Sequence, residues 1–397
     1  MLIALGVTGG IAAYKAPELV RGFDQAGAEV QVILTSHAQQ FVAPLTLQTL
    51  SRRKVLIDQY DLDAEQTIQH IELTRGIHAL LVAPATANIL AKLARGVADD
   101  LLSTFYTAVT APVVVAPAMN TRMWMHPATQ ANLAALKARG VTVIDPESGW
   151  LAEGETGQGR MAEPGRIVEV TLAAAARSTQ LEGNTIVVTA GPTREAIDPV
   201  RFVSNRSSGK MGYALAAAAA RRGARVILIS GPVDLPVPFG VERIAVETSA
   251  QMRDAVLESR SGAEAVFMAA AVSDYVPRFS SAKIKKTGGE LTLSLEEGPD
   301  ILSELGRDRR ERLLIGFAAE TEELLANARS KLERKRVDFI VANDVSRPDI
   351  GMDSDDNAVT ILAGTGESWE VPKASKAEIA EQILDRVLGG VPAGGRA

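Results

Sequence analysis

Short apolar runs alternate with segments of helical period at the start of the chain. Residues 2–7 form an apolar run that ends at the turn Thr8-Gly9-Gly10, and a second apolar run covers Val30–Leu34. Between them a helical pattern extends from Ile11 to about Gly27. Short apolar runs are typical of buried strands, and a period of 3.6 is typical of amphipathic helices. The pattern therefore predicts a strand, a glycine turn, a helix and a second strand.

The same alternation continues through the first half of the chain. Further strands and helices are expected at Ala79–Ala83, Asn88–Ala94, Asp99–Ala108 and Val113–Ala116. Strands that alternate with helices form parallel sheets with helices packed on both faces. The first half is therefore predicted to be an α/β domain with a flavodoxin-like, doubly wound parallel sheet.

A polar stretch at Ser178–Asn184 follows a helical pattern near Pro164–Arg177 and interrupts the alternation. We place a domain boundary there, with domains at 1–178 and 184–397. Beyond the boundary the pattern restarts, and the elements it predicts are the helix Met211–Arg222 and the strands Ile186–Ala190, Arg225–Ile229, Ala265–Ala270, Leu314–Phe317 and Phe339–Asn343. The second half is predicted to be another Rossmann-like domain.

Composition constrains the partners and the location. A chain of 397 residues is long for one core, which agrees with two domains. The net charge of -6 and the lack of a long apolar run predict neither a nucleic-acid nor a membrane partner. The chain has no cysteine, which excludes disulfides, cysteine-ligated metals and a catalytic thiol. The lack of cysteine also leads us to expect a cytoplasmic protein. The N-terminus has no basic region, and we interpret it as a first strand and not as a signal peptide.

Each half contains a glycine turn between a strand and a helix, Gly9-Gly10 and Ser207–Gly212. Such turns let backbone N–H groups approach a phosphate, although glycine can also serve only to make a turn tight. The second strands end at Leu34–His37 and Ser230–Pro232, without the acid that holds the ribose of NAD. The second turn also lacks Walker A spacing. A nicotinamide dehydrogenase and a P-loop ATPase are therefore disfavoured.

Longer motifs point to a family. The first half contains, in order, GVTGGIAAYKA, FVAPLTLQTLS, HIEL, APATANILAKLARGVADDLLST, APAMNTRMW and GRMAEP. It resembles the homo-oligomeric flavin-containing cysteine decarboxylases. The second half contains TAGPTREAIDPVRFVSNRSSGKMG, AAAVSDY, KIKK, GFAAET and ANDV followed by GMDSDDNAV, and it resembles phosphopantothenate–cysteine ligase. Together, from residue 2 to about 386, the chain resembles the bacterial bifunctional phosphopantothenoylcysteine decarboxylase/phosphopantothenate–cysteine ligases.

The resemblance implies two reactions of coenzyme A biosynthesis. CTP would activate 4'-phosphopantothenate as an acyl-cytidylate, and cysteine would then form the amide. FMN would support decarboxylation of that product to 4'-phosphopantetheine, since the cofactor carries the redox chemistry and the protein orients it. Mg²⁺ is expected with the triphosphate, and its ligands are unknown. The resemblance also implies a homo-oligomer, with a dodecamer as one assembly.

In the first half the resemblance assigns catalysis to His70, in HIEL, and to Asn120, in PAMN. Histidine can relay a proton near neutral pH, and Asn120 would bind the substrate carboxylate at the carboxyl end of a strand. Taken alone, His70 is no better a candidate than the other three histidines, and Asn120 could be a turn residue. The implied flavin contacts, each also open to a turn or cap role, are Gly10, Thr35, Thr86 and Ser103.

One position departs from the family pattern. Many relatives have the cysteine of LACG before GRM, and its thiol donates the proton for the final reduction. Here the segment is Leu151-Ala152-Glu153-Gly154. A carboxylic acid whose pKa is raised by burial can donate a proton, so Glu153 is a catalytic candidate. Three alternatives stay open: that water substitutes, that this half is impaired, and that Glu153 is a solvated loop residue.

In the second half the resemblance assigns Arg201 and Lys283 to the departing pyrophosphate and Asn205 to the acyl-nucleotide. Cations near developing negative charge favour pyrophosphate departure. Arg201 and Lys283 could also be surface charges, and Asn205 a turn residue. The remaining implied substrate and nucleotide contacts are Asp274, Phe317, Lys331, Lys335 and Asn343.

Two further functions compete with this prediction. The first half could be only a flavin-binding module beside an active ligase, which the departure at Glu153 motivates. It could instead be an inactive regulator, against which the presence of His70 and Asn120 argues. A visible flavin spectrum would support the first half as a flavoprotein.

Overall fold

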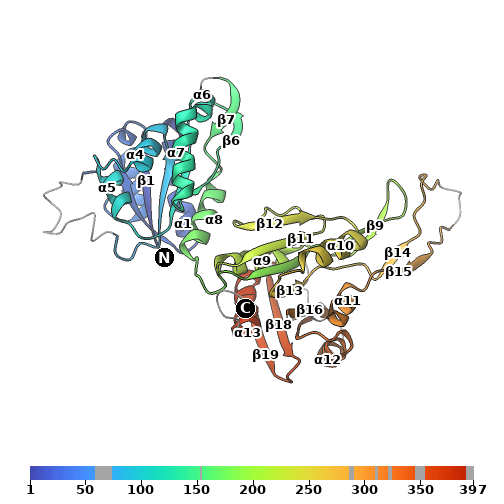
Figure 1. Ribbon diagram of the computed structural model, residues 1–397. Helices are drawn as coiled ribbons and strands as arrows, with labels where there is room; N and C mark the ends of the chain where they lie inside the picture. The colour runs from blue at the N-terminus through green and yellow to red at the C-terminus, as the bar shows by residue number, and fades with distance from the viewer. Residues whose placement is uncertain are drawn as a thin grey trace. The chain divides into compact units, whose positions relative to one another are not determined.

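The computed structural model describes residues 1–58, 74–152, 154–285, 290–308, 312–320, 324–344 and 354–389. The chain divides into two compact units, Met1–Ala176 and Arg177–Ala397 (Figure 1). The division falls beside the polar stretch Ser178–Asn184. Part of this stretch packs on the second unit, since Leu181 is fully buried and its N–H donates to the carbonyl of Arg222.

The front unit contains a five-stranded sheet in the order β2-β1-β3-β4-β5, and every neighbouring pair is parallel. The strands are β1 (Leu2–Val7), β2 (Glu29–Leu34), β3 (Ala79–Ala85), β4 (Val113–Pro117) and β5 (Thr142–Val143). This is the strand order of flavodoxin. The predicted fold class of this half is confirmed.

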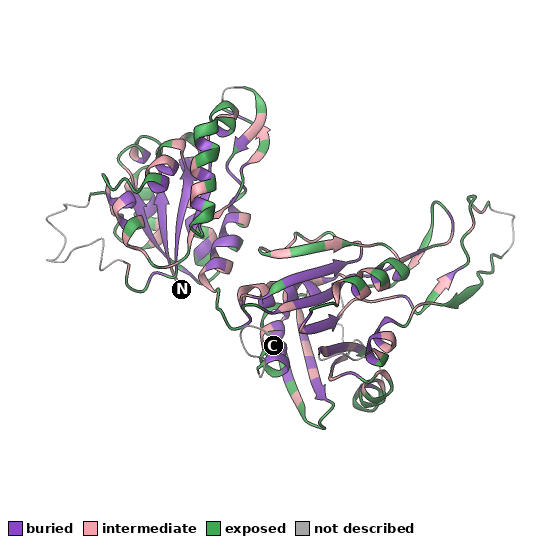
Figure 2. Ribbon diagram, viewed as in Figure 1, coloured by how far each residue is buried: buried purple, intermediate pink, exposed green. Residues whose placement is uncertain are grey.

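Helices cover the front sheet, and its central strand β3 is buried at every position (Figure 2). Leu80 and Val82 of β3 pack with α4, α5 and α7, while α8 contacts β3 and β4. The helices are α1 (Ala16–Gln25), α2 (Pro44–Ser51), α4 (Ala87–Arg95), α5 (Leu101–Ala108), α6 (Thr121–Met125), α7 (Pro127–Ala138) and α8 (Pro164–Ala175), with the 3-10 helices η1 (Ile11–Lys15) and η2 (Ala38–Gln40).

Two features of the front unit differ from the sequence-based expectation. The helix expected from Ile11 to about Gly27 is a 3-10 turn followed by α1, which has Pro17 in its first turn. Proline lacks a backbone N–H and is tolerated only at a helix start, so it marks the beginning of α1. The antiparallel hairpin of β6 (Glu147–Trp150) and β7 (Thr156–Arg160) was not predicted, because these short strands are polar and glycine-containing.

The back unit contains an eight-stranded sheet in the order β12-β11-β8-β13-β16-β17-β18-β19. The strands are β8 (Thr185–Ala190), β11 (Arg225–Ser230), β12 (Val241–Ala245), β13 (Ala265–Met268), β16 (Leu313–Glu320), β17 (Phe339–Asp344), β18 (Asp356–Ala363) and β19 (Ser368–Ser375). The first six in the sheet are parallel, and the last two add antiparallel pairs. The Rossmann-like prediction is confirmed, with an antiparallel extension that it lacked.

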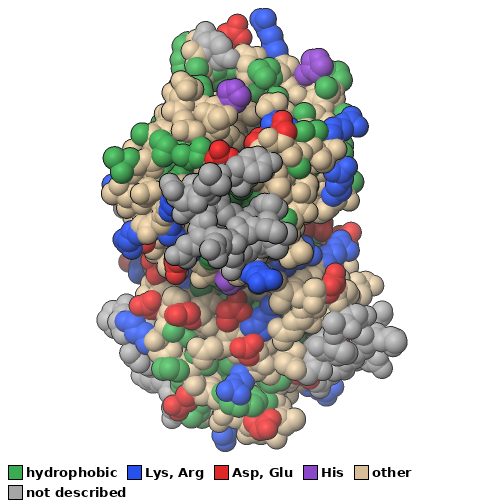
Figure 3. Space-filling model, turned by 90° about the vertical axis from the view of Figure 1, so that its left-hand side faces the viewer, with side chains coloured by type: hydrophobic (Ala, Val, Ile, Leu, Met, Phe, Trp, Pro, Cys, Tyr) green, Lys and Arg blue, Asp and Glu red, His purple; other side chains and the backbone are tan. Residues whose placement is uncertain are grey.

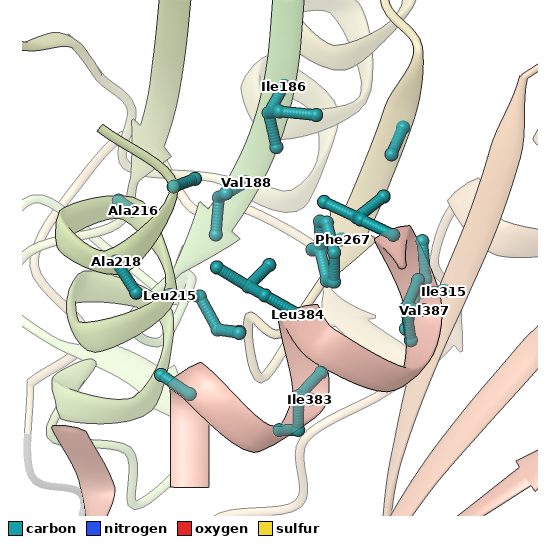
Figure 4. Packing of buried hydrophobic residues seen from close by; sticks show 14 of the residues in the cluster. Ile186, Val188, Leu215, Ala216, Ala218, Phe267, Ile315, Ile383, Leu384 and Val387 are labelled. Atoms are coloured by element: carbon teal, nitrogen blue, oxygen red, sulfur yellow. The ribbon is translucent and has the colours of Figure 1, made fainter. Parts of the chain in front are cut away.

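Helices pack on both faces of the back sheet. Alternate residues of β8 face opposite cores: Ile186 and Val188 meet α9 and α13, whereas Val187 meets the core that contains α10, α11 and α12. Figure 4 shows Leu384 of α13 close to Val188 and Phe267. The helices are α9 (Lys210–Arg221), α10 (Ser249–Ser259), α11 (Ile301–Arg307), α12 (Leu324–Lys335) and α13 (Lys376–Leu388).

Two small hairpins complete the back unit. They are β9 (Arg194–Ala196) with β10 (Phe202–Ser204), and β14 (Tyr275–Pro277) with β15 (Leu295–Glu297). No helix among the described residues combines the length and the apolar character that a membrane span requires. On the face drawn in Figure 3, basic and acidic side chains are intermixed.

Candidate active sites

Polar side chains gather where β1 and β3 end at one edge of the front sheet. Thr8 is 3% exposed and donates its hydroxyl hydrogen to the carbonyl of Pro84 over 2.6 Å. Thr86 begins α4: its hydroxyl accepts from the N–H of Ile89 at 3.4 Å, and its own N–H donates to Thr8 at 3.3 Å. A Cβ on Gly10 would stand 3.3 Å from the methyl group of Thr86. Two of the predicted flavin contacts, Gly10 and Thr86, are therefore neighbours.

Thr35 and Asn120 lie at the ends of the flanking strands. Thr35 follows β2, and its N–H and hydroxyl both donate to the carbonyl of Val7, over 3.1 and 3.2 Å. Asn120 caps α6, since its Oδ1 accepts from the N–H of Arg122 at 2.8 Å. The turn before Asn120 hydrogen-bonds to the end of β3. Four predicted residues thus lie along the edge where doubly wound sheets bind ligands.

Ser103 is fully buried and forms a capping box at the start of α5. Its hydroxyl donates to the Asp100 carboxylate at 2.9 Å and accepts from the Asp100 N–H at 3.1 Å. Burial alone would raise the pKa of the Asp100 carboxyl, but hydrogen bonds from Lys92 and Ser103 outweigh burial and lower it. A flavin contact in which the Ser103 hydroxyl donates would have to replace its bond to Asp100.

His70 and Glu153 lie outside the described residues. Glu153 stands between β6 and β7 in the sequence, and the described part of that hairpin packs beside the Asn120 turn. The carbonyl of Gly159 accepts from the N–H of Met119 at 3.0 Å. A Cβ on Gly157 would stand only 2.3 Å from the Thr121 hydroxyl oxygen, so glycine is needed for this close approach.

A cleft of about 340 Å³ opens at the carboxyl edge of the back sheet. The ends of β13, β16 and β17 line it, together with the turn before α9 and the starts of α11 and α13. Predicted residues that line it are Asp274, Phe317, Lys331, Lys335 and Asn343. The fold therefore brings these predicted residues from four separate segments to one cavity: the turn after β13, β16, α12 and β17.

The start of α9 borders this cleft. Gly209 precedes the helix with φ of +76°, a conformation that favours glycine, and no side chain caps the helix. A Cβ on Gly212 would stand 2.6 Å from the Cβ of Ala190 and 2.8 Å from the carbonyl oxygen of Thr189. Glycine thus lets α9 lie directly on the end of β8, with its first N–H groups beside the cleft. This arrangement suits a phosphate.

The cleft is lined by more basic than acidic side chains. Lys331 donates to the carbonyl of Phe317 over 2.7 Å, and Lys335 pairs with Asp300. Burial alone would raise the pKa of the Asp300 carboxyl. Hydrogen bonds from Lys335 and Ser303 outweigh burial and lower this pKa. Lys376 is 7% exposed. The charged residues of the lining are Lys210, Lys331, Lys335, Lys376, Asp274 and Asp300.

Asn205 contacts the cleft wall, whereas Arg201 and Lys283 are not among the lining residues. The Asn205 amide donates to the carbonyls of Ala271 and Val272, both over 3.2 Å, and these two residues line the cleft. Arg201 ends the turn between β9 and β10. Lys283 is exposed and lies between β14 and β15.

The sequence-based assignment missed several lining residues. Asp300 has a cap signature, because it precedes an apolar run and accepts from Ser303 three residues later. That signature predicts a helix start and gives no sign of a ligand. Asn357 comes from the unpredicted antiparallel extension, and Lys376 begins α13, which follows it. The motif GMDSDDNAV contains Asn357, but the predicted strands and helices did not place either residue near the glycine turn.

A metal centre made by the protein alone is not evident. Within the ranges that the structure describes, no three histidine, aspartate or glutamate side chains gather closely enough to hold a metal ion. The metal ligands stay unassigned.

Comparison with known proteins gives the two units a family. A model described as "Flavoprotein" matches residues 1–176, and one described as "DNA/pantothenate metabolism flavoprotein C-terminal domain" matches residues 181–390. The chain is 48% identical over 389 residues to the Coenzyme A biosynthesis bifunctional protein CoaBC of Bacillus subtilis (strain 168), covering 97% of this chain and 96% of that protein. The chain belongs to this family of bifunctional coenzyme A biosynthesis proteins.

Other members are similarly close. The same protein of Escherichia coli (strain K12) is 44% identical over 391 residues, covering 97% of this chain and 96% of that one. Among solved structures, a mutant PPC decarboxylase complexed with pantothenoylaminoethenethiol is 36% identical, covers 43% of this chain and 94% of its own, and has a TM-score of 0.39. The predicted resemblance is confirmed: the chain is a bifunctional enzyme of coenzyme A biosynthesis, with a flavoprotein decarboxylase and a ligase activity.

Proposed function

We propose that the back domain, residues 184–397, joins 4'-phosphopantothenate to cysteine with CTP as the activating nucleotide. The observation that carries this proposal is the cleft at the carboxyl edge of the back sheet, with four lysines and the uncapped start of α9 around it. A triphosphate is the ligand that such a positively charged, N–H-rich site fits.

The proposed chemistry has two displacements. The 4'-phosphopantothenate carboxylate attacks the α-phosphorus of CTP, pyrophosphate leaves, and an acyl-cytidylate forms. The amine of cysteine then attacks the acyl carbon, CMP leaves, and the amide forms. Lys283 and Arg201 would stabilise charge on the departing pyrophosphate, and Asn205 would hold the acyl group. Asp274, Phe317 and Asn343 would contact nucleotide or substrate. Mg²⁺ would accompany the triphosphate.

We also propose that the front domain, residues 1–178, binds FMN and decarboxylates the ligated product. The residues at the edge of the sheet fit such a group, because Gly10, Thr35, Thr86 and Asn120 lie together at the carboxyl ends of the strands, where doubly wound sheets bind ligands. The glycine turn also lies close to its neighbours there. A Cβ on Gly9 would stand 2.4 Å from that of His37, and one on Gly10 would meet Thr86. When bound, FMN would supply the redox chemistry that makes loss of the carboxylate easy.

The protein's own groups would supply orientation and protons in the front domain. Asn120 would bind the substrate carboxylate, and His70 would relay a proton. Contacts to the flavin are proposed for Gly10, Thr35, Thr86 and Ser103. For Ser103 the contact would replace the bond that its hydroxyl donates to the Asp100 carboxylate. Glu153 is proposed as the proton donor for the final reduction, because the chain has no cysteine.

The assembly and the location complete the proposal. Exposed apolar side chains of the front unit include Ile11, Tyr14, Leu45 and Met125, each more than 60% exposed. Their exposure supports a homo-oligomer, a dodecamer among the possible assemblies, and light scattering would measure its mass. A cytoplasmic location is proposed with the small-molecule substrates.

The proposed function is tested with the whole protein by comparing nucleotides. Ligation with CTP should exceed ligation with ATP by a large factor, since a site that hydrogen-bonds one base leaves polar groups unpaired with another. The visible spectrum of the same sample should show FMN. Equal ligation with both nucleotides would contradict the CTP assignment, and a colourless protein would contradict the flavin assignment.

A further inference from the structure

A buried carboxylate ties two hairpins of the back unit together. Asp198 begins the turn between β9 and β10, and its side chain has no exposed surface. Its Oδ1 accepts from the N–H groups of Val200 and Arg201, both at 2.9 Å. These two local bonds form an Asx-type turn, which an asparagine at this position could also make.

The second carboxylate oxygen makes the long-range contacts. Asp198 Oδ2 accepts from Nε and Nη2 of Arg201 at 3.0 and 2.5 Å, and from the N–H of Ile284 at 3.1 Å. Nη2 of Arg201 also donates to the carbonyl of Ile284 over 2.7 Å. The Asp198–Arg201 pair therefore binds both backbone groups of Ile284, the residue that follows Lys283.

The surroundings of Asp198 favour its charged form. The guanidinium of Arg201 holds the pKa of Asp198 far below its usual range, and three backbone N–H donors add to this. Buried charges are rigidly held when every partner is present, because losing one partner leaves the others unsatisfied. The segment that contains Lys283 is therefore fixed at Ile284, while the Lys283 side chain itself is exposed.

We propose that Asp198 is a positioning residue of the ligase site, which holds Lys283 in place by fixing the backbone of Ile284 against the β9–β10 hairpin. The same hairpin leads directly to Asn205. The inference rests on the proposed role of Lys283 in forming the acyl-cytidylate. In this proposal Arg201 has two roles. It stabilises charge on the departing pyrophosphate, and its bond to the Ile284 carbonyl helps to hold the segment that contains Lys283.

Asp198→Asn separates the local from the long-range role. The asparagine oxygen can keep the two bonds of the turn, but its NH2 group then faces two donors, the Ile284 N–H and the Arg201 guanidinium. Glu195→Gln is the matched control. Glu195 lies in the same hairpin, is 3% exposed, and accepts from the N–H of Ser249 at 2.8 Å, so it anchors β9 to α10.

The assay is pyrophosphate release from 4'-phosphopantothenate and CTP without cysteine, measured on the full-length protein. Asp198→Asn should slow release by about 10- to 100-fold, the cost of a misplaced catalytic group. Lys283→Gln should also be slow, and the defect of the double variant should be smaller than the product of the two single defects, because Asp198 acts in part through Lys283. Glu195→Gln should stay within about 3-fold of wild type.

The outcomes separate this inference from the proposed function. If Lys283→Gln is slow but Asp198→Asn releases pyrophosphate at the wild-type rate, the inference is overturned and the ligase assignment stands. If Lys283→Gln releases pyrophosphate as fast as wild type, the proposed role of Lys283 is wrong, and the positioning role of Asp198 is wrong with it. If the rate defect of the double variant equals the product of the two single defects, the positioning role of Asp198 is overturned as well. Should Asp198→Asn not fold, Asp198→Ser, which keeps one oxygen for the turn but lacks the oxygen that binds Ile284, enters the same cycle with the same expected result.

Discussion

Replacing Gly212 with alanine should impair ligation and leave decarboxylation intact. The new Cβ would stand 2.6 Å from the Cβ of Ala190, where ordinary contacts begin at 3.4 Å, so α9 would have to move outward by roughly 0.8 Å. Such overpacking costs about 1–3 kcal/mol, and the lower entropy of the unfolded chain returns only about 0.4–1 kcal/mol. A shift of this size beside reacting groups lowers rates by up to about 100-fold.

The assay compares two glycines in helix starts. Gly165 lies in the first turn of α8, and a Cβ there would meet nothing within 4 Å. Gly165→Ala should therefore keep or raise the melting temperature, with both activities unchanged. Gly212→Ala should lower kcat/KM for CTP about 10- to 100-fold, while CO₂ release from supplied 4'-phosphopantothenoylcysteine stays at the wild-type rate. Normal ligation by Gly212→Ala would refute the argument that α9 must rest on β8.

Three further predictions concern both units. His70→Asn and Asn120→Gln should each abolish CO₂ release and spare ligation, measured with separate substrates; equal loss of ligation in folded variants would show that the sites are not independent. Glu153→Gln should stop the reaction at the oxidised aminoenethiol, identified by mass spectrometry, because the final reduction needs a proton; equal rates of phosphopantetheine formation would make Glu153 a spectator. Burial would raise the pKa of Glu381, but bonds from Arg221 and Arg222 outweigh it and lower the pKa. Its stabilisation is therefore complete above its ordinary value of 4.5 and lost as the pH falls through the lowered pKa. Glu381→Gln should cost about 0.5–1.5 kcal/mol at neutral pH in urea unfolding. The variant should also lose less stability than the wild type as the pH falls, and an unchanged pH dependence of stability would contradict this.

Most of the parallel strands could be predicted from sequence because they are apolar runs bounded by turn residues. Burial on both faces requires this, as in β3, where no position reaches solvent. Two parallel strands were not predicted: β5 has only two residues, and β12 has exposed charged positions. The extension of β18 and β19 was missed because its outer strand, β19, is mostly polar and exposed or half-buried, with Val371 as its one buried position. Lys283 could be assigned to the site because it lies in the motif KIKK, and the glycine turn before α9 was recognised because it lies in the family motif that ends in SSGKMG.

The rest of the site depends on tertiary structure. Lys376 reaches the cleft only because two antiparallel strands return the chain to the sheet edge. Asp198 was not singled out, because its importance comes from a hydrogen bond to Ile284, 86 residues away. A carboxylate before proline is typical of a turn, and the sequence carries no sign of the distant partner.

The central claim is that one chain performs two consecutive reactions, and a stoichiometry measures it directly. The purified protein would receive 4'-phosphopantothenate, CTP, Mg²⁺ and cysteine labelled in its carboxyl group, and labelled CO₂ and pyrophosphate would be followed together. The account predicts that each pyrophosphate released is followed by one labelled CO₂, with 4'-phosphopantetheine as the product. Pyrophosphate without CO₂ would contradict the decarboxylase assignment of the front domain, and the absence of both would contradict the ligase assignment of the back domain.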